Sequence, residues 1–442
     1  MTRCAACRFS VSTPAGHAID RANAFPALLS EYVMPLVDPR HRRLFLALFA
    51  VFTIFGMSMT IIGAALPKIL VSFGWSYFVA GLVLAANAIA YFSFTFVGGY
   101  AIGYLGPRRT MVTGLAISAL GLLFFGSTPS PAINIVLGAL IGFGQGFVEI
   151  TINWTTLRLD TARTGRPMNL MHGAFAVGAI LGPLTLALLL HANLDWVAVY
   201  HLMSIVFLAL AVLFGVMPMD VPAETPDPQQ GETARHLNTH PAYYLSFLAL
   251  FCYVGVELGV SNWVAQYFVA VFDYPAAQSA LLVSLFWAGL LAGRFGVPLL
   301  YRGLRQDLVL VGFSLLATVT IAVLSLLGFG ATGPLVQAIA MVMVLLAGLG
   351  CSIFYPAVIT LLGNCFPHAQ SQAIGFAATG GGIGAFLFPF LMSALADGWG
   401  IRAGFATYAI FAVAMTLAAI GLARAAGRDV TRTRSPSSHQ SP

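Results

Sequence analysis

Two acidic residues, Glu149 and Glu257, lie inside apolar segments, whereas the remaining 13 of the 15 Asp and Glu residues fall in predicted loops and tails. A charged side chain at the centre of a bilayer costs at least ~2.5–3.5 kcal/mol on insertion scales. An acid retained there usually faces a protein interior or a wet cavity, where it can exchange a proton or accept hydrogen bonds from a solute. These two glutamates therefore indicate a pathway for an ion or a solute.

The apolar segment around Glu149 carries a polar stripe. Gln145, Glu149 and Asn153 are four residues apart, so on a helix they share one face, and Trp154 adjoins them. The next apolar segment opens with a histidine, His172, on a helix that we expect to pack nearby. The alternative is that Glu149 and His172 only lock helices together through buried hydrogen bonds.

Glu257 is followed by a second group of polar and aromatic residues: Ser261, Asn262, Trp263 and Gln266. Glu257 and Ser261 share a helical face, but Gln266 lies opposite unless the helix breaks at Gly255 or Gly259. Two roles remain open for Glu257, which are contact with a solute and anchoring of its helix to the neighbouring helices.

Amide and aromatic side chains recur in the apolar segments, and together they suit a sugar. Sugar rings stack on aromatic faces, and sugar hydroxyls need amide or carboxylate partners. The candidates are Asn87, Trp154, Trp263, Gln266, Trp287 and Tyr355. Several could instead be packing or interfacial residues, which is a common role of aromatics in membrane helices.

The elements that position these residues are membrane helices. The chain is 59% hydrophobic and only 8% charged, whereas soluble domains are roughly 25% charged. Runs long enough to cross ~30 Å of hydrocarbon are predicted at 44–66, 79–103, 109–127, 131–157, 167–190, 196–216, 241–269, 278–300, 307–329, 333–364, 369–394 and 400–423. The chain is therefore predicted to be an all-α membrane protein with twelve transmembrane helices.

Basic residues predict the orientation of these helices. Apart from Lys68 and Arg402, we assign every Lys and Arg to one side of the membrane, including Arg294 at the end of the eighth span. The positive-inside rule places that side, with both termini, in the cytoplasm. The basic balance reflects this asymmetry and gives no reason to expect a nucleic-acid partner. No apolar signal-peptide core precedes Leu44, and Met34 is an alternative start.

An internal repeat divides the chain into halves. Gly142-Phe-Gly144 matches Gly348-Leu-Gly350, 206 positions later, and the Gly178–Pro183 segment matches Gly384–Pro389 at the same offset. We therefore predict a tail at 1–43, a six-helix bundle at 44–216, a cytoplasmic linker at 217–240, a second bundle at 241–423 and a tail at 424–442. The last fourteen residues have the composition of a disordered segment.

The repeat also separates packing from chemistry. The shared glycines serve helix packing in both halves. Glu149 corresponds to Tyr355, however, and His172 to Ala378, so the polar residues belong to one half only.

Six spans, a linker and six related spans form the plan of the major facilitator transporters, in which the solute binds between the halves. Within that superfamily the chain resembles the fucose:proton symporter family. The similar segments are Gly146-Phe-Val-Glu149-Ile-Thr-Ile-Asn153-Trp, Asn169-Leu-Met-His172, Tyr253-Val-Gly-Val-Glu257 and Gly293-Arg294-Phe295. The fucose permease has a glutamine at the position of His172, and it has an aspartate where this chain has Gly63.

The resemblance implies inward transport of a sugar or similar solute with a proton, by a protein that is not an enzyme and needs no cofactor. Because Gly63 replaces the acid of the first span, we expect Glu149 to carry the proton, with Glu257 in reserve. We expect a monomer in a bacterial cytoplasmic (inner) membrane. Efflux of an amphipathic compound is the second hypothesis. A membrane sensor is a third, and an integral-membrane enzyme is less favoured because metal-ligand and nucleophile motifs are lacking.

Overall fold

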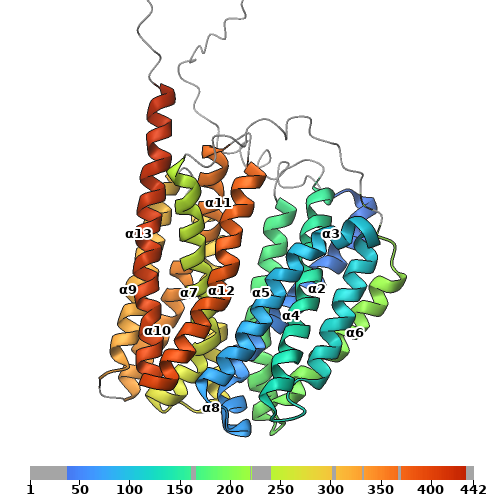
Figure 1. Ribbon diagram of the computed structural model, residues 1–442, viewed down its shortest axis with the longest axis vertical. Helices are drawn as coiled ribbons and strands as arrows, with labels where there is room; N and C mark the ends of the chain where they lie inside the picture. Colours follow the sequence, from blue (N-terminus) through green and yellow to red (C-terminus); the bar gives the residue numbers. More distant parts are fainter. Residues whose placement is uncertain are drawn as a thin grey trace, which may run out of the picture.

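The computed structural model describes residues 37–160, 166–219, 221, 240–300, 305–330, 333–366 and 370–434, and within them it is entirely helical. A short 3₁₀ helix, Pro39–His41, precedes the first long helix. The α-helices are α2 (Arg42–Phe73), α3 (Tyr77–Phe124), α4 (Pro131–Leu159), α5 (Arg166–His191), α6 (Val197–Val216), α7 (Pro241–Phe272), α8 (Ala276–Leu300), α9 (Gln306–Leu327), α10 (Pro334–Cys351), α11 (Phe354–Cys365), α12 (Gln370–Trp399) and α13 (Ile401–Arg434). They stand side by side in two groups, blue to green and yellow to red in Figure 1. The two groups are the two predicted six-helix bundles.

Helix α3 contains two membrane crossings. Its 48 residues would extend ~72 Å if straight, more than twice the hydrocarbon thickness. Gly106 interrupts it with φ 78° and ψ 162°, a conformation that suits glycine, and Pro107 follows. Asn87 donates to the Gly138 carbonyl oxygen of α4, and Ser118 donates to the Ile141 carbonyl oxygen, so the chain reverses at Gly106. Eleven helices of membrane-spanning length within the described residues thus supply the twelve predicted crossings.

The predicted span 333–364 is not one continuous helix, because α10 ends at Cys351 and α11 begins at Phe354. Pro356 lacks the N–H that would bond to the Ser352 carbonyl oxygen in an unbroken helix. That carbonyl accepts a hydrogen bond from Nε of Arg294 instead, at 3.4 Å.

Helix α13 continues to Arg434, so the prediction that a disordered segment begins near residue 429 is wrong for its first six residues. Hydropathy marks where the apolar run stops, and it does not mark where the helix ends. Residues 1–36, which include Met34, 222–239 of the predicted linker and 435–442 lie outside the described part of the chain.

The repeated glycines make equivalent contacts in the two halves. A Cβ added to Gly142 would collide with the carbonyl of Asn87 on α3, and one added to Gly348 would collide with that of Phe286 on α8. Likewise Gly178 of α5 lies against Thr53 of α2, and Gly384 of α12 lies against Phe251 of α7. The 206-residue offset therefore records the same close backbone approaches, made twice.

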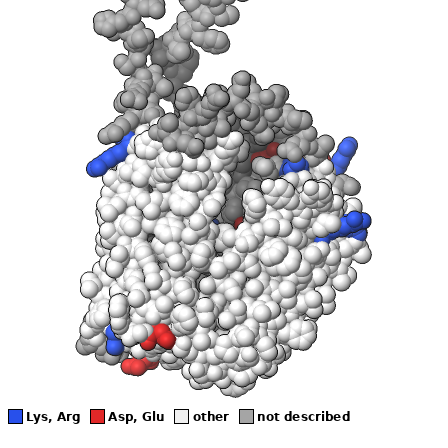
Figure 2. Space-filling view, viewed as in Figure 1, with Lys and Arg blue, Asp and Glu red and all other residues white. Residues whose placement is uncertain are grey.

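The two halves touch closely at the end where α2 turns into α3. Tyr77 accepts a hydrogen bond from Gln266 at 3.4 Å, and the rings of Phe78 and Phe390 lie 5.7 Å apart. Gly63 of α2 also packs directly on the backbone of α7. Toward the opposite end, where α13 projects, the described surface is hollowed between the halves, as Figure 2 shows. We call the end where α2 turns into α3 the closed end.

Candidate proton and solute site

Glu149 and Asn153 form a half-buried polar pair on α4. The amide of Asn153 hydrogen-bonds to the Glu149 carboxyl group. The second carboxyl oxygen, Oε2, and the Asn153 oxygen, Oδ1, are both buried and have no hydrogen-bond partner among the described residues. Because buried polar atoms are nearly always paired, two neighbouring acceptors without donors indicate a missing proton or ligand.

Glu149 faces the second half of the molecule, because its charge acts on the hydroxyl of Tyr355 on α11. His172 of α5 faces the same way, since it is within the electrostatic reach of Arg294 on α8. The imidazole also packs its edge on Phe52, with ring centroids 5.7 Å apart. The stripe on α4 and the histidine on α5 are thus directed at the boundary between the halves.

Glu257 lies on the other side of that boundary in a different environment. Its side chain is 9% exposed, and Oε1 accepts a hydrogen bond from the Tyr253 hydroxyl at 2.8 Å. Nη2 of Arg294 is 3.8 Å from the same oxygen. Glu257 therefore has a cation beside it, which Glu149 lacks within the described residues.

Arg294 lies in the eighth span, as the sequence predicts, but its pairing with Glu257 was not predicted. Helix α8 continues to Leu300, so Arg294 stands within the helix, with its side chain only 21% exposed. Gly293 allows this arrangement, because a Cβ there would collide with Ser352. A signal was present in the sequence, since Arg294 is the only charged residue in the run 278–300.

Two of the predicted solute contacts, Asn87 and Gln145, are hydrogen-bonded inside the first half. The Asn87 amide donates to Gly138 and, at 3.3 Å, to Oε1 of Gln145. Gln145 donates in turn to Ser58 of α2 at 2.9 Å, and it is only 1% exposed. These groups tie α2, α3 and α4 together behind Glu149.

The tryptophans occupy three separate environments. Trp154 is covered by the guanidinium of Arg158, 3.7 Å above its ring. Trp287 donates to Ser261 at 2.8 Å, and its ring edge meets Phe175 of the other half at 5.5 Å. Trp263 is fully buried, and its indole N–H has no partner within the described residues. Trp263 meets Tyr77 of the first half, with ring centroids 5.9 Å apart, so Trp263 and Trp287 both lie at the boundary between the halves.

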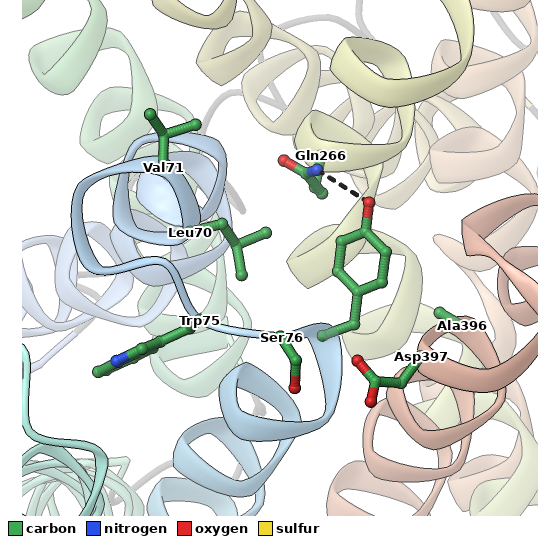
Figure 3. Close-up of a pocket in the computed structure, with 8 residues that line it drawn as sticks. Leu70, Val71, Trp75, Ser76, Gln266, Ala396 and Asp397 are labelled. Carbon is green, nitrogen blue, oxygen red and sulfur yellow. Dashed lines mark hydrogen bonds between the residues drawn. The ribbon is translucent and has the colours of Figure 1, made fainter.

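Gln266 is at the closed end, well away from Glu257. Helix α7 is unbroken, and the spaces beside Gly255 and Gly259 are filled by the rings of Phe388 and Tyr408. The nine positions from Glu257 to Gln266 therefore span ~13 Å of straight helix, so the suggested break does not bring them together. Gln266 instead lines a cavity of about 310 Å³, shown in Figure 3, with Leu70, Val71, Trp75, Ser76, Tyr77, Ala396 and Asp397. The backbone of Asn262, four residues before Gln266, lies against Gly63 of α2.

A model of the Major Facilitator Superfamily matches residues 48–344 and 303–441. The chain belongs to this superfamily. It is 24% identical over 371 residues to a putative glucose/galactose transporter of Helicobacter pylori, covering 79% of this chain and 88% of that protein. It is 26% identical over 338 residues to a glucose/galactose transporter of Brucella abortus, with 72% and 78% covered.

Solved structures show the same fold. The crystal structure of the E. coli fucose:proton symporter FucP in the outward conformation matches with a TM-score of 0.57 and 21% identity, over 85% of this chain and 97% of that one. A bacterial homolog of the human lysosomal transporter Spinster, inward-facing and unoccupied, matches with a TM-score of 0.70 and 13% identity, over 89% and 98%. The predicted fold and the resemblance to the fucose:proton symporter family are both confirmed. The protein is a multi-pass membrane transporter and not an enzyme.

Proposed function

We propose that the protein takes up a sugar or a similar small polar solute together with a proton, by alternating access. The observation that carries this proposal is the Glu149–Asn153 pair, with two buried acceptor atoms that lack partners among the described residues and with Tyr355 of the second half within reach of the Glu149 charge. Hydroxyl groups are donors of the kind that such acceptors need. The named glucose/galactose transporters support a sugar as the solute class.

Glu149 is the proton carrier in this proposal. A carboxyl group that is neutral can remain buried, whereas its charged form favours contact with water. Closing one end of the transporter and opening the other changes that contact, so proton binding and solute binding become linked. Asn153, His172, Trp287 and Tyr355 are the proposed solute contacts, because they surround Glu149 or meet at the boundary between the halves.

The remaining candidate residues are assigned structural roles in this proposal. Asn87 and Gln145 hold α4 in place, and Trp154 stacks with Arg158. Asn262, Trp263 and Gln266 belong to the closed end, which we assign to the outside of the cell because the positive-inside rule places the termini in the cytoplasm. In this orientation the structure is the state that releases solute inward.

Purified protein in vesicles tests the proposal. With an inward proton gradient, labelled glucose or galactose should accumulate, and collapsing the gradient should stop accumulation while exchange of solute across the membrane continues. Asp307→Asn is a matched control, because this acid lies at the edge of the membrane, paired with Arg305 and remote from Glu149. Solute driven out of vesicles against an inward proton gradient would favour the efflux hypothesis instead.

A further inference from the structure

The carboxyl groups of Glu149 and Glu257 belong to different halves of the molecule and both act on Tyr355, but only one has a cation beside it. Glu257 is 3.8 Å from the guanidinium of Arg294, whereas no Lys or Arg of the described residues pairs with Glu149. An opposite charge within ~4–6 Å favours the ionised form of a carboxyl group, while burial without one favours the neutral form. The surroundings of Glu257 therefore favour its ionised form, whereas those of Glu149 favour its neutral form.

Arg294 is fixed by more than the ion pair. Its Nε donates to the carbonyl oxygen of Ser352, which Pro356 leaves without a helical partner. The absence of a side chain at Gly293 lets α8 approach Ser352. A hydrogen bond to the backbone at a helix break cannot follow a change in protonation, so it holds the guanidinium beside Glu257.

The neighbourhood of each carboxyl group supports the same asymmetry. The titratable and charged groups that act on Glu257, within the described residues, are Tyr253 on α7, Arg294 on α8, Cys351 on α10 and Tyr355 on α11. Arg294 is the only cation among them. Around Glu149 the corresponding groups are Asn153 on its own helix and Tyr355 on α11, neither of which carries charge.

We propose that Arg294 is a positioning residue that selects the proton carrier: it holds Glu257 in the ionised form, so that Glu149 alone exchanges the proton. This inference rests on the proposed proton coupling for its biological meaning. The assignment of charge to the two glutamates can be tested without any solute.

Infrared difference spectroscopy of the purified protein, recorded as a function of pH, follows the carbonyl band of protonated carboxyl groups. The buried component of this band should disappear in Glu149→Gln and persist in Glu257→Gln. In Arg294→Gln a second buried carboxyl group should titrate, so the buried component should about double. In the double variant Arg294→Gln with Glu257→Gln, the component should again correspond to a single carboxyl group. Arg294→Lys should resemble the native protein, because the charge is retained.

Arg402→Gln is the matched control, because Nε of Arg402 also donates to a helix-end carbonyl, that of Gly328, at 2.6 Å. It should leave the buried component unchanged. A single titrating group in Arg294→Gln, or loss of the component in Glu257→Gln alone, would overturn the proposal. The Glu257→Gln measurement needs no arginine variant, so the proposal stays testable if Arg294→Gln does not fold. The infrared measurement contains no solute. Failure of the uptake experiment alone therefore does not contradict the proposal about Arg294.

Discussion

Gly63 of α2 lies directly against Asn262 of α7: a Cβ added to the glycine would be 2.6 Å from the Cα of Asn262. Such a distance between backbone-anchored atoms is too short for a packed interface, so any side chain at position 63 must push the two halves apart. The position at which the fucose permease carries an aspartate is thus, in this chain, part of the contact that closes one end. The absence of a side chain at position 63 is thus what allows α2 and α7 to approach so closely.

Gly63→Ala should therefore shift the protein toward the state that is open at this end. Overpacking costs ~1–3 kcal/mol, and each kcal/mol changes a two-state ratio about fivefold. In a background without the five native cysteines, Gln266→Cys, 8% exposed as Gln, should react at least ~5-fold faster with an impermeant maleimide. Gly103→Ala is the control, because a Cβ there meets nothing within 4 Å. Equal labelling rates in the two variants would show that Gly63 does not hold the end closed.

The internal repeat predicts equal sensitivity at equivalent glycines. Gly142→Ala and Gly348→Ala each place a Cβ on the backbone of the neighbouring helix, and each should destabilise the fold by ~1–3 kcal/mol. Thermal unfolding in detergent should show two similar decreases in melting temperature. Gly99→Ala, with open space around it, should show none. A marked decrease for only one of the pair would mean that the halves do not share this packing.

Pro356→Ala should stabilise the protein while impairing transport. Alanine restores the N–H that can bond to Ser352, which favours one continuous helix in place of α10 and α11. Replacing proline within a helix gains up to ~3 kcal/mol of intrinsic helix propensity. Continuing the helix moves Tyr355 relative to Glu149 and competes with the bond from Arg294.

Melting temperature and initial rates of uptake measure the two effects of Pro356→Ala separately. Pro334→Ala is the control, because Pro334 is the first residue of α10, where a missing N–H removes no helical bond. If transport is unchanged in Pro356→Ala, the break between α10 and α11 has no part in the cycle.

The sequence predicts the helices and their pairing well, because both follow from one-dimensional patterns. Hydropathy shows where the chain can cross the membrane, and the 206-residue offset identified glycines that make equivalent contacts. The span 333–364 is also found, at Pro334–Gly363, but hydropathy does not show the break between α10 and α11 within it. Pro356 was visible in the sequence, but its consequence depends on Arg294 being available to bond the freed carbonyl.

The candidate site could be predicted only in part. Gln145, Glu149 and Asn153 share a helical face as expected, yet Gln145 is hydrogen-bonded within the first half while Glu149 faces the second. Spacing defines a face of the helix but not which neighbour covers each part of it. The partner of Arg294 was not predicted for a similar reason, because a charge near the end of an apolar run can face a membrane surface or, as here, pair with another side chain.

Glu149→Gln should separate solute exchange from proton-driven accumulation. Glutamine resembles the neutral carboxyl group in shape and keeps an oxygen acceptor next to Asn153, but it cannot release a proton. Labelled sugar should therefore still exchange across vesicles that contain unlabelled sugar, whereas accumulation under an inward proton gradient should fall to the level reached without a gradient.

The pH dependence of the native protein follows from the same residue. Loading from outside requires the protonated form of Glu149, so raising the external pH should raise KM for the solute and leave the maximal rate less affected. In Glu149→Gln this dependence should vanish, because no proton has to bind. Asp307→Asn, with its charge partner Arg305 outside the site, should keep the native pH profile. If Glu149→Gln still accumulates sugar with an undiminished pH dependence, the coupling proton is carried elsewhere, and Glu257→Gln becomes the variant that must abolish it.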